Sequence, residues 1–336
     1  MAGFGNVGQA FAQLLMNKEK TLAQDFDLRC IITGISTGRH GTAINPQGID
    51  LPAALQLAAS GGTLDTLSTV TAPASTLDFI RSCPADVLIE ISPVNHLTGQ
   101  PAASHLQAAL EMGMHAITAN KGPVVHAYQQ LTQLAQSTGK RFLFEAAVMD
   151  GAPIFSLFRG PLPAAELRGF HGILNSCTNL LLERMESGET LEEAVAYGSS
   201  IGITETDPSA DIDGWDAAIK VAALVTVLMK TQLKPQDIQR QGIRGITPQD
   251  IAQARQAGER WKLVCQARRT PEGVQASVLP QRVGPDSPLY TVRGTSSFVQ
   301  FEMDVLPGLG IIEGDPGPET TAYGLLADLL NALRGQ

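Results

Sequence analysis

A glycine-rich turn near the start of the chain constrains the fold more than any other feature. The residues Gly3-Phe4-Gly5-Asn6-Val7-Gly8 lead into 9–15, a segment with the apolar spacing of a helix. Glycines at these spacings permit a tight bend and let backbone amides approach a pyrophosphate at the helix N-terminus. The turn therefore predicts a dinucleotide-binding domain of the Rossmann type. The predicted cofactor contacts here are Gly3, Phe4, Gly5, Asn6, Val7 and Gly8.

Such a turn normally follows a central β-strand, yet only Met1 and Ala2 precede Gly3. We therefore expect that about five to seven residues, a typical strand length, are missing from the start of the domain. The alternative is that another segment fills the central slot, which requires an unusual topology.

The next predicted strand, 28–36, ends in a loop that contains Arg39 and has no acidic residue. An acid at this place would bind a ribose 2′-hydroxyl, whereas arginine suits a 2′-phosphate. NADP is therefore expected to be used at least as well as NAD.

Two further segments complete the predicted nucleotide domain. The strand 86–93 runs into Ser92, and the strand that starts at His115 delivers Lys121 beyond its carboxyl end, with a predicted helix over 100–114 between them. This β-α-β alternation predicts a doubly wound parallel sheet, and ligands bind at the carboxyl ends of its strands. Ser92 and Lys121 are therefore predicted to lie at the cofactor, although Lys121 could also be an ordinary solvated lysine.

An acid-rich segment, 205–220, contains five carboxylates and one lysine and precedes the apolar run 221–229. The run predicts a buried helix, so the acidic segment is anchored against the core. Asp213-Gly214 predicts a turn before the helix, and Asp216 and Lys220 would share one helix face. In isolation, this pattern also fits a helix start with one stabilising ion pair.

Taken together, these motifs resemble homoserine dehydrogenases over nearly the whole chain, in the short form that lacks a regulatory domain. The matching motifs are the glycine turn, Thr-Ala-Asn-Lys at 118–121, Gly-Ile-Leu-Asn-x-x-Thr-Asn at 172–179, the acidic motif 202–220, and a glycine loop at 314–317. The resemblance implies reversible NAD(P)-dependent hydride transfer between L-homoserine and L-aspartate 4-semialdehyde, a step toward threonine and methionine.

The predicted catalytic groups are two lysines. Hydride transfer to an aldehyde creates an alkoxide, which needs a proton donor, and Lys220 is the predicted donor. Lys121 would act on the cofactor side, where it helps to polarise the carbonyl or to hold the nicotinamide.

The resemblance also assigns the binding residues. It implies that Glu205 and Asp216 bind the substrate, with Asp211 as a further acid, and that Gly202 and Gly317 approach the cofactor through their backbone. Asp207 and Asp213 are expected to be turn and cap residues.

The family also has a monovalent cation site, usually for sodium, and the segment 142–153 lies in the matching place. The resemblance implies that the Glu145 side chain and the carbonyls of Val148, Asp150 and Ala152 are the ligands. Asp150 departs from the small residues more usual there. A strand end without any ion is the open alternative.

Three rival functions use features of the sequence. Asn175-Ser176-Cys177-Thr178-Asn179 is similar to the nucleophile motif of acylating semialdehyde dehydrogenases, with Cys177 as the attacking thiol. Gly198-Ser199-Ser200-Ile201-Gly202 matches a hydrolase nucleophile elbow, but the residues before it predict a helix instead of the required strand. A nucleotide sensor without catalytic activity is the third.

Composition limits the classes of protein and partner. The 336 residues allow two domains, and the net charge of −9 argues against nucleic acid and anionic membrane surfaces. Four cysteines without paired spacing indicate reduced thiols, so a cytoplasmic enzyme is expected.

Residues 1–140 are expected to form the nucleotide-binding domain, and residues 141–305 an α+β domain for substrate binding and dimerisation. Within the second domain, 261–268 and 289–304 are predicted strands. The remaining residues, 306–336, are expected to return to the first domain through a helix over 321–333. The family pairs its substrate domains through a sheet, so the resemblance also implies a homodimer.

Overall fold

The computed structural model describes residues 1–71, 73–204 and 207–334, which fold into two compact units. Unit 1 comprises Met1–Pro153 together with Gly317–Gln336, and unit 2 comprises Ile154–Pro316.

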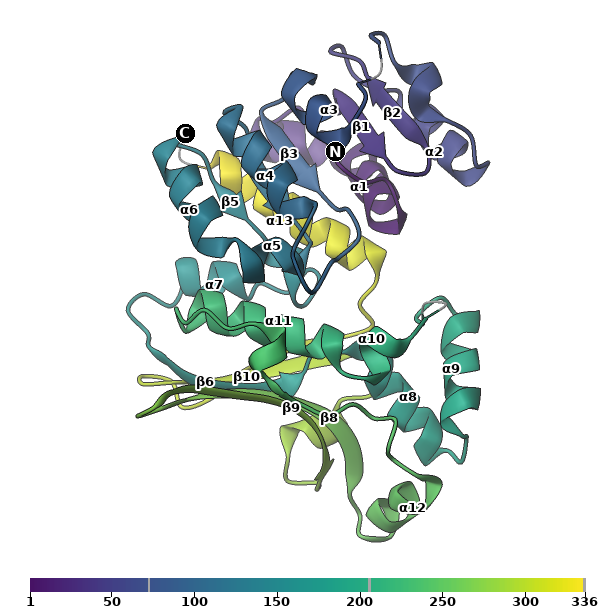
Figure 1. Ribbon diagram of the computed structural model, residues 1–336, viewed down its shortest axis with the longest axis vertical. Helices are drawn as coiled ribbons and strands as arrows, with labels where there is room; N and C mark the ends of the chain where they lie inside the picture. The colour runs from purple at the N-terminus through teal and green to yellow at the C-terminus, as the bar shows by residue number, and fades with distance from the viewer. Residues whose placement is uncertain (72, 205–206, 335–336) are drawn as a thin grey trace. The chain divides into compact units, whose positions relative to one another are not determined.

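Unit 1 is built around a largely parallel sheet (Figure 1). Its strands are β1 (Gly34–Thr37), β2 (Gly41–Ile44), β3 (Val87–Glu90), β4 (His115–Thr118) and β5 (Phe142–Leu143). β3, β4 and β5 are parallel neighbours, whereas β1 and β2 form an antiparallel pair. Ala2 forms parallel bridges with both Ser36 and Glu90, so it joins the two groups of strands. The predicted Rossmann-type α/β fold is confirmed.

The strand expected over 28–36 begins only at Gly34. The amino group of Met1 donates to the Gly34 carbonyl (2.8 Å), and Ala2 pairs with Ser36. Residues 28–33 instead line a cavity of about 470 Å³, together with residues 84–89 of the neighbouring strand region. A strand requires a ladder partner, and the cavity lies where a partner for 28–33 would run. The additional N-terminal strand stays a prediction.

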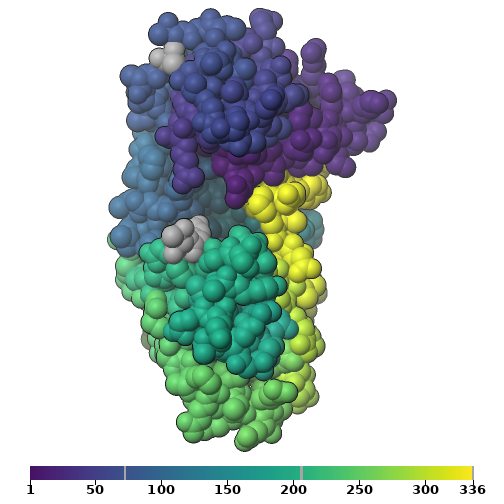
Figure 2. All heavy atoms as spheres, turned by 90° about the vertical axis from the view of Figure 1, so that its right-hand side faces the viewer, coloured from purple at the N-terminus to yellow at the C-terminus, as the bar shows by residue number. Residues whose placement is uncertain are grey.

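Helices cover the sheet of unit 1. They are α1 (Asn6–Phe26), α2 (Leu51–Ala59), α3 (Thr76–Ser82), α4 (Ala102–Glu111), α5 (Lys121–His126), α6 (Tyr128–Ser137) and α13 (Pro318–Leu333), with 3₁₀ turns at Leu64–Leu67 and Glu145–Ala147. α4 packs against β3 and β4, which confirms the predicted β-α-β unit. α1 and α13 pack together, and Figure 2 shows purple atoms of the N-terminal segment beside the yellow C-terminal ones.

Unit 2 contains a six-stranded sheet in the order β11-β10-β6-β8-β9-β7. Its strands are β6 (Leu167–Ile173), β7 (Gln239–Arg240), β8 (Arg260–Thr270), β9 (Gly273–Val283), β10 (Ser297–Met303) and β11 (Leu309–Glu313). β7 and β9 are parallel, and the other neighbours are antiparallel. The strand expected over 289–304 is shorter, because Pro288–Thr291 forms a 3₁₀ turn and Gly294 has a positive φ of 55°.

The helices of unit 2 include one that is almost entirely buried. They are α7 (Phe155–Arg159), α8 (Ser176–Glu186), α9 (Leu191–Ser200), α10 (Ser209–Ile212), α11 (Trp215–Leu228) and α12 (Pro248–Gln256), with a further 3₁₀ turn at Pro235–Asp237. α11 begins after Gly214, whose φ is 80°, and packs against β8 and β9. The helix predicted from the apolar run is therefore confirmed. No helix in the described part of the chain has the length and apolarity of a membrane span.

Candidate active site

The three glycines of the N-terminal turn differ in what surrounds them. A Cβ on Gly3, which has a φ of 109°, would lie 2.5 Å from the Ile91 carbonyl oxygen, and one on Gly8 would lie 3.0 Å from the Ile91 side chain. A Cβ on Gly5 would meet nothing within 4 Å. Gly3 and Gly8 therefore allow the turn and α1 to pack against the end of β3, whereas Gly5 leaves open space beside the backbone.

The same turn has the electrostatics of an anion site. Gly5 is the N-cap of α1, Gly5 and Asn6 are exposed, and the first turn of α1 has no acidic residue. The first amides of a helix carry partial positive charge, so this end suits a pyrophosphate. Phe4 is 1% exposed within the apolar core, so its contribution to ligand binding is limited to its backbone. These residues fit a dinucleotide.

The other predicted cofactor residues of unit 1 lie at strand ends. Arg39 is exposed in the β1–β2 turn, where the Thr37 hydroxyl accepts from its backbone amide (3.1 Å). Ser92 follows β3, and Lys121 is the first residue of α5, which starts soon after β4 ends, with only Ala119 and Asn120 between them. Gly317 is the N-cap of α13. Gly202 belongs to unit 2, where it follows α9 with a φ of 75°.

Asp211, Asp216 and Lys220 lie together in unit 2. The Lys220 Nζ is 3.2 Å from the Asp216 Oδ2 and donates to the Leu174 carbonyl (2.7 Å). The Asn175 side-chain amide donates to both Asp211 (2.6 Å) and Asp216 (3.0 Å). One amide therefore holds two carboxylates beside one lysine.

Burial and the neighbouring carboxylate raise the pKa of Asp211 above its usual range. Loss of solvation is the larger cause, and the charge of Asp216 is the second. Hydrogen bonding by Asn175 and the charge of Lys220 act in the opposite direction. The cluster thus concentrates negative charge in a poorly solvated place and balances it with one cation, an arrangement that suits a cationic substrate group and a proton transfer.

Sequence reasoning missed the role of Asn175 and of the Leu174 carbonyl. Asn175 is also the N-cap of α8, because its Oδ1 accepts from the Thr178 amide (2.8 Å). Both residues were part of a recognised motif, and Asn before a helix predicts a cap. The second contact of the amide, with Asp211 and Asp216 far along the sequence, depends on tertiary structure.

The remaining acids of the motif have separate positions. Asp207 accepts from the Ser209 amide (3.1 Å), as a turn residue does, and Asp213 pairs with Arg244 (2.9 Å). Glu205 lies outside the described residues, so its predicted substrate contact stays a prediction.

The predicted cation ligands form a buried corner in unit 1. Glu145 is 2% exposed, and its backbone amide donates to Asp328 of α13 (2.6 Å). Asp150 has a φ of 39°, and its carboxylate accepts from the Thr321 hydroxyl. The Asp150 side chain therefore anchors α13. Val148 and Ala152 are buried in the same segment.

The rival catalytic motifs lack the geometry that they need. Cys177 is 5% exposed, and burial, with the charge of Asp211 second, raises the pKa of its thiol to about 12. A nucleophilic cysteine requires a lowered pKa, so Cys177 is a poor nucleophile. Ser199 and Ser200 end the helix α9, whereas a nucleophile elbow must follow a strand.

Comparison with known proteins agrees with both halves of this geometry. Residues 3–145 match the family model "Homoserine dehydrogenase, NAD binding domain", and residues 153–330 match the model "Homoserine dehydrogenase". The NAD(+)-dependent homoserine dehydrogenase of Pseudomonas canavaninivorans is 33% identical over 98% of this chain and 94% of its own length. A homoserine dehydrogenase of Methanocaldococcus jannaschii is also 33% identical, over 98% of this chain and 97% of its own length.

Solved structures give the same result. A putative homoserine dehydrogenase from Archaeoglobus fulgidus has a TM-score of 0.84 at 28% identity and covers 98% of this chain and 97% of its own. A hyperthermophilic archaeal homoserine dehydrogenase in complex with NADPH has a TM-score of 0.83 at 28% identity and covers 98% of this chain and 95% of its own. The chain therefore belongs to the homoserine dehydrogenase family of NAD(P)-dependent oxidoreductases.

Proposed function

We propose that this protein catalyses the reversible conversion of L-aspartate 4-semialdehyde to L-homoserine, a step in the synthesis of threonine and methionine. The observation that carries the proposal is the cluster of Lys220, Asp216, Asp211 and Asn175, which places a lysine beside two carboxylates. Family membership supports the same reaction.

Lys220 is the proposed proton donor. The nicotinamide cofactor supplies the hydride in one direction and accepts it in the other. In the reducing direction, the substrate oxygen gains negative charge and the Lys220 ammonium transfers a proton to it. In the oxidising direction, the neutral amine of Lys220 takes the hydroxyl proton. Asp216 and the Leu174 carbonyl fix the Nζ, so the proton is held at a defined position.

The acids would bind the amino group of the substrate. A substrate ammonium has three donors, and carboxylates are its natural acceptors. The Asn175 side chain donates to the carboxylates of both Asp211 and Asp216 and so holds them close together, which supports this role. Glu205 is the third proposed acid. A bound ammonium would also relieve the repulsion between Asp211 and Asp216.

The proposed cofactor contacts are the glycine turn 3–8, Ser92, Lys121, Gly202 and Gly317. The open space at Gly5 and the exposed amides of the α1 N-terminus support a pyrophosphate at the turn. We propose that NADP is used at least as well as NAD, because Arg39 is an exposed cation after β1. The Pseudomonas relative is described as NAD(+)-dependent and a hyperthermophilic archaeal relative binds NADPH, so the family uses both.

A monovalent cation, such as sodium, is proposed at Glu145 and the carbonyls of Val148, Asp150 and Ala152. An all-oxygen set suits a hard cation, and Glu145 is 2% exposed. If the ion stabilises this corner, replacing sodium by a large organic cation at equal ionic strength should lower the melting temperature of the wild type more than that of Glu145→Gln.

A homodimer that pairs the sheets of unit 2 is also proposed. α8 and α11 lie against one face of that sheet (Figure 1). Gln266 and Phe298 are on the other face, because the residues that precede and follow them on their strands are buried and they are not. Ile312 of β11 lies opposite Phe298 of β10, so the two side chains are on the same face of the sheet, and Ile312 is 63% exposed. An exposed apolar side chain on such a face suits sheet-to-sheet packing. Sedimentation equilibrium would measure the mass.

The cytoplasm is the proposed location, since Cys30, Cys83, Cys177 and Cys265 are all free thiols.

A spectrophotometric assay tests the proposed reaction. Purified protein with L-homoserine and oxidised NADP or NAD should form the reduced cofactor, and L-aspartate 4-semialdehyde should consume it in the reverse assay. D-homoserine and L-serine are matched controls. D-homoserine has the opposite configuration at the α-carbon, and L-serine has a side chain that is one methylene shorter. No turnover with L-homoserine and either cofactor would contradict the proposal.

A further inference from the structure

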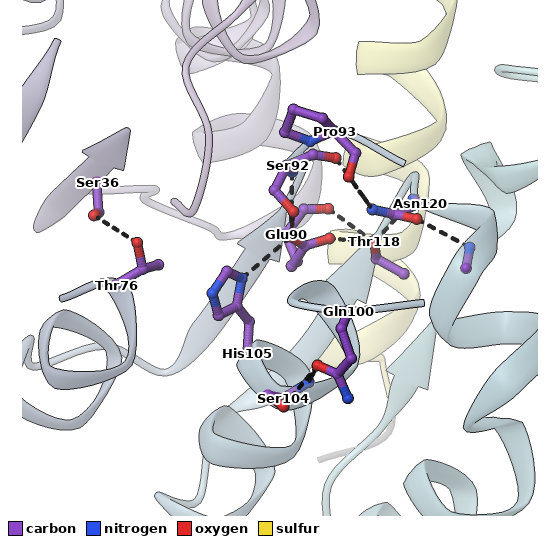
Figure 3. Close-up of polar contacts among 11 residues, drawn as sticks. Ser36, Thr76, Glu90, Ser92, Pro93, Gln100, Ser104, His105, Thr118 and Asn120 are labelled. Atoms are coloured by element: carbon purple, nitrogen blue, oxygen red, sulfur yellow. Dashed lines mark hydrogen bonds and ion pairs between the residues drawn. The ribbon is translucent and has the colours of Figure 1, made fainter. Parts of the chain in front are cut away.

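A buried carboxylate lies beneath the loops that follow β3 and β4. Glu90, the last residue of β3, is 0% exposed, and His105 of α4 is 5% exposed beside it. The His105 Nδ1 is 3.4 Å from the Glu90 Oε1 (Figure 3). The reaction proposed above uses neither residue, and an ionisable pair at this depth is costly unless its hydrogen bonds are well satisfied.

Hydrogen-bonding groups surround both carboxyl oxygens of Glu90. Its Oε1 accepts from the Ser92 amide (3.2 Å), from the Ser92 hydroxyl and from His105. Its Oε2 lies 3.0 Å from the Thr118 hydroxyl, which also approaches the Glu90 carbonyl (2.8 Å). A carboxyl group has about four acceptor positions, and its partners here come from the loop after β3, from β4 and from α4. The Glu90 carboxyl group is therefore held by three separate segments of the chain.

The contacts continue from Glu90 to both loops. Thr118 accepts from the Asn120 amide (2.9 Å), and the Asn120 side chain donates to the Ser92 carbonyl (3.1 Å). The Asn120 Oδ1 in turn accepts from the Gly122 amide (2.9 Å), so Asn120 caps α5, whose first residue is Lys121. A single network thus fixes Ser92 on one strand end and the residue before Lys121 on the next (Figure 3).

We propose that Glu90, held by His105, is a positioning residue that sets the geometry of Ser92 and Lys121 for the nicotinamide cofactor. The proposal rests on the cofactor site proposed above. Ser92 is held at its amide and its hydroxyl, so Glu90 controls both its backbone and its side chain. Small displacements of groups that orient a reactant are costly for catalysis. Glu90 therefore acts through Ser92 and Asn120, without contact with the cofactor.

A purely structural role predicts a different pattern. A buried hydrogen-bonded pair that served only stability would lower the melting temperature on substitution and leave the folded fraction with normal cofactor affinity. A positioning role predicts weaker cofactor binding by folded protein, and recovery when a donor is restored beside Glu90.

The test compares four variants with the wild type. Glu90→Gln presents an amide N–H₂ to a site where every neighbour is a donor. His105→Leu removes the donor from α4, and His105→Asn places an amide N–H near the position of Nδ1. Leu110→Ala is the matched control, because Leu110 is a buried residue of the same helix, and its loss leaves a cavity without removing a hydrogen bond.

The first readout is the dissociation constant for NADPH, measured by nucleotide fluorescence below the melting temperature of each variant. We expect Glu90→Gln to weaken binding about ten-fold or more and His105→Leu to weaken it less. We also expect His105→Asn to recover most of the loss, and Leu110→Ala to lower the melting temperature with unchanged affinity. In steady state, Glu90→Gln should raise KM for NADP more than KM for homoserine.

Two outcomes overturn the proposal. One is wild-type NADPH affinity in folded Glu90→Gln; the other is an equal loss of affinity in Leu110→Ala. The first readout, the NADPH dissociation constant, needs no turnover. A protein that binds NADPH but does not oxidise homoserine would therefore refute the proposed reaction, and the comparison of NADPH affinities would still test the role of Glu90. A wild-type chain that bound neither NADPH nor NADH would refute both.

Discussion

Replacing Lys220 by alanine should abolish most of the turnover. The Lys220 Nζ is fixed by the Leu174 carbonyl at 2.7 Å and by Asp216 at 3.2 Å, and the side chain is 13% exposed, so water cannot easily take over its role. A positioned proton donor contributes about 10²- to 10⁴-fold. This range corresponds to about 3–5 kcal/mol of transition-state stabilisation, and we expect kcat to fall by that factor in both directions.

A second variant separates the proton from the charge. Lys220→Arg keeps a cation beside Asp216, but a guanidinium does not give up its proton near neutral pH. If proton transfer is the main role, Lys220→Arg should be nearly as slow as Lys220→Ala. Recovery by arginine to near wild-type kcat would instead indicate a purely electrostatic role.

The pH profile gives an independent check. The charge of Lys220 holds down the pKa of Asp211, so its removal should raise that pKa further. If substrate binding requires ionised Asp211, the acidic limb of kcat/KM should move to higher pH in Lys220→Ala. Lys234→Ala, an exposed lysine of the same unit, is the control and should match the wild type. Wild-type kcat in Lys220→Ala would refute the reasoning.

Three further results are expected. Glu205→Ala should raise KM for homoserine and leave NADPH affinity unchanged, because the acid would bind the substrate ammonium; an equal loss of cofactor affinity would move Glu205 to the nucleotide. Cys177→Ser should keep oxidoreductase activity, and iodoacetamide should label Cys177 slowly at pH 8, since a pKa of about 12 leaves about one thiolate in 10⁴. A trapped thioester would favour the acylating mechanism. Arg39→Ala should weaken NADP more than NAD through loss of a phosphate contact, and an unchanged preference between the two would exclude Arg39 from phosphate recognition.

Local patterns were sufficient for much of this fold. The glycine turn identified the start of α1, and the β-α-β alternation identified β3, α4 and β4. The apolar run after Lys220 predicted α11, because nine consecutive apolar or small residues have no solvated side and must be buried. The pair Asp216–Lys220 also followed from helical spacing, since residues four apart share a face.

Features that depend on distant partners were not predictable. β1 is shorter than its apolar sequence suggests, because strand length depends on what pairs with it. Asn175 was expected in a motif, but its bridge to Asp211 and Asp216 depends on how α8, α10 and α11 pack. Glu90 appeared within an apolar strand, and only the positions of Ser92, His105 and Thr118 around it explain a buried carboxyl group there.

The most direct test of the central claim follows the hydride itself. Homoserine with both hydrogens of the hydroxyl-bearing carbon replaced by deuterium should, on incubation with the wild-type protein and NADP, give NADPH that has gained one deuterium, together with aspartate 4-semialdehyde that keeps the other. Mass spectrometry of the nucleotide measures the transfer, and Lys220→Ala should slow it without changing the label's destination. Reduced cofactor without deuterium, or no reduced cofactor from either NADP or NAD, would contradict the account.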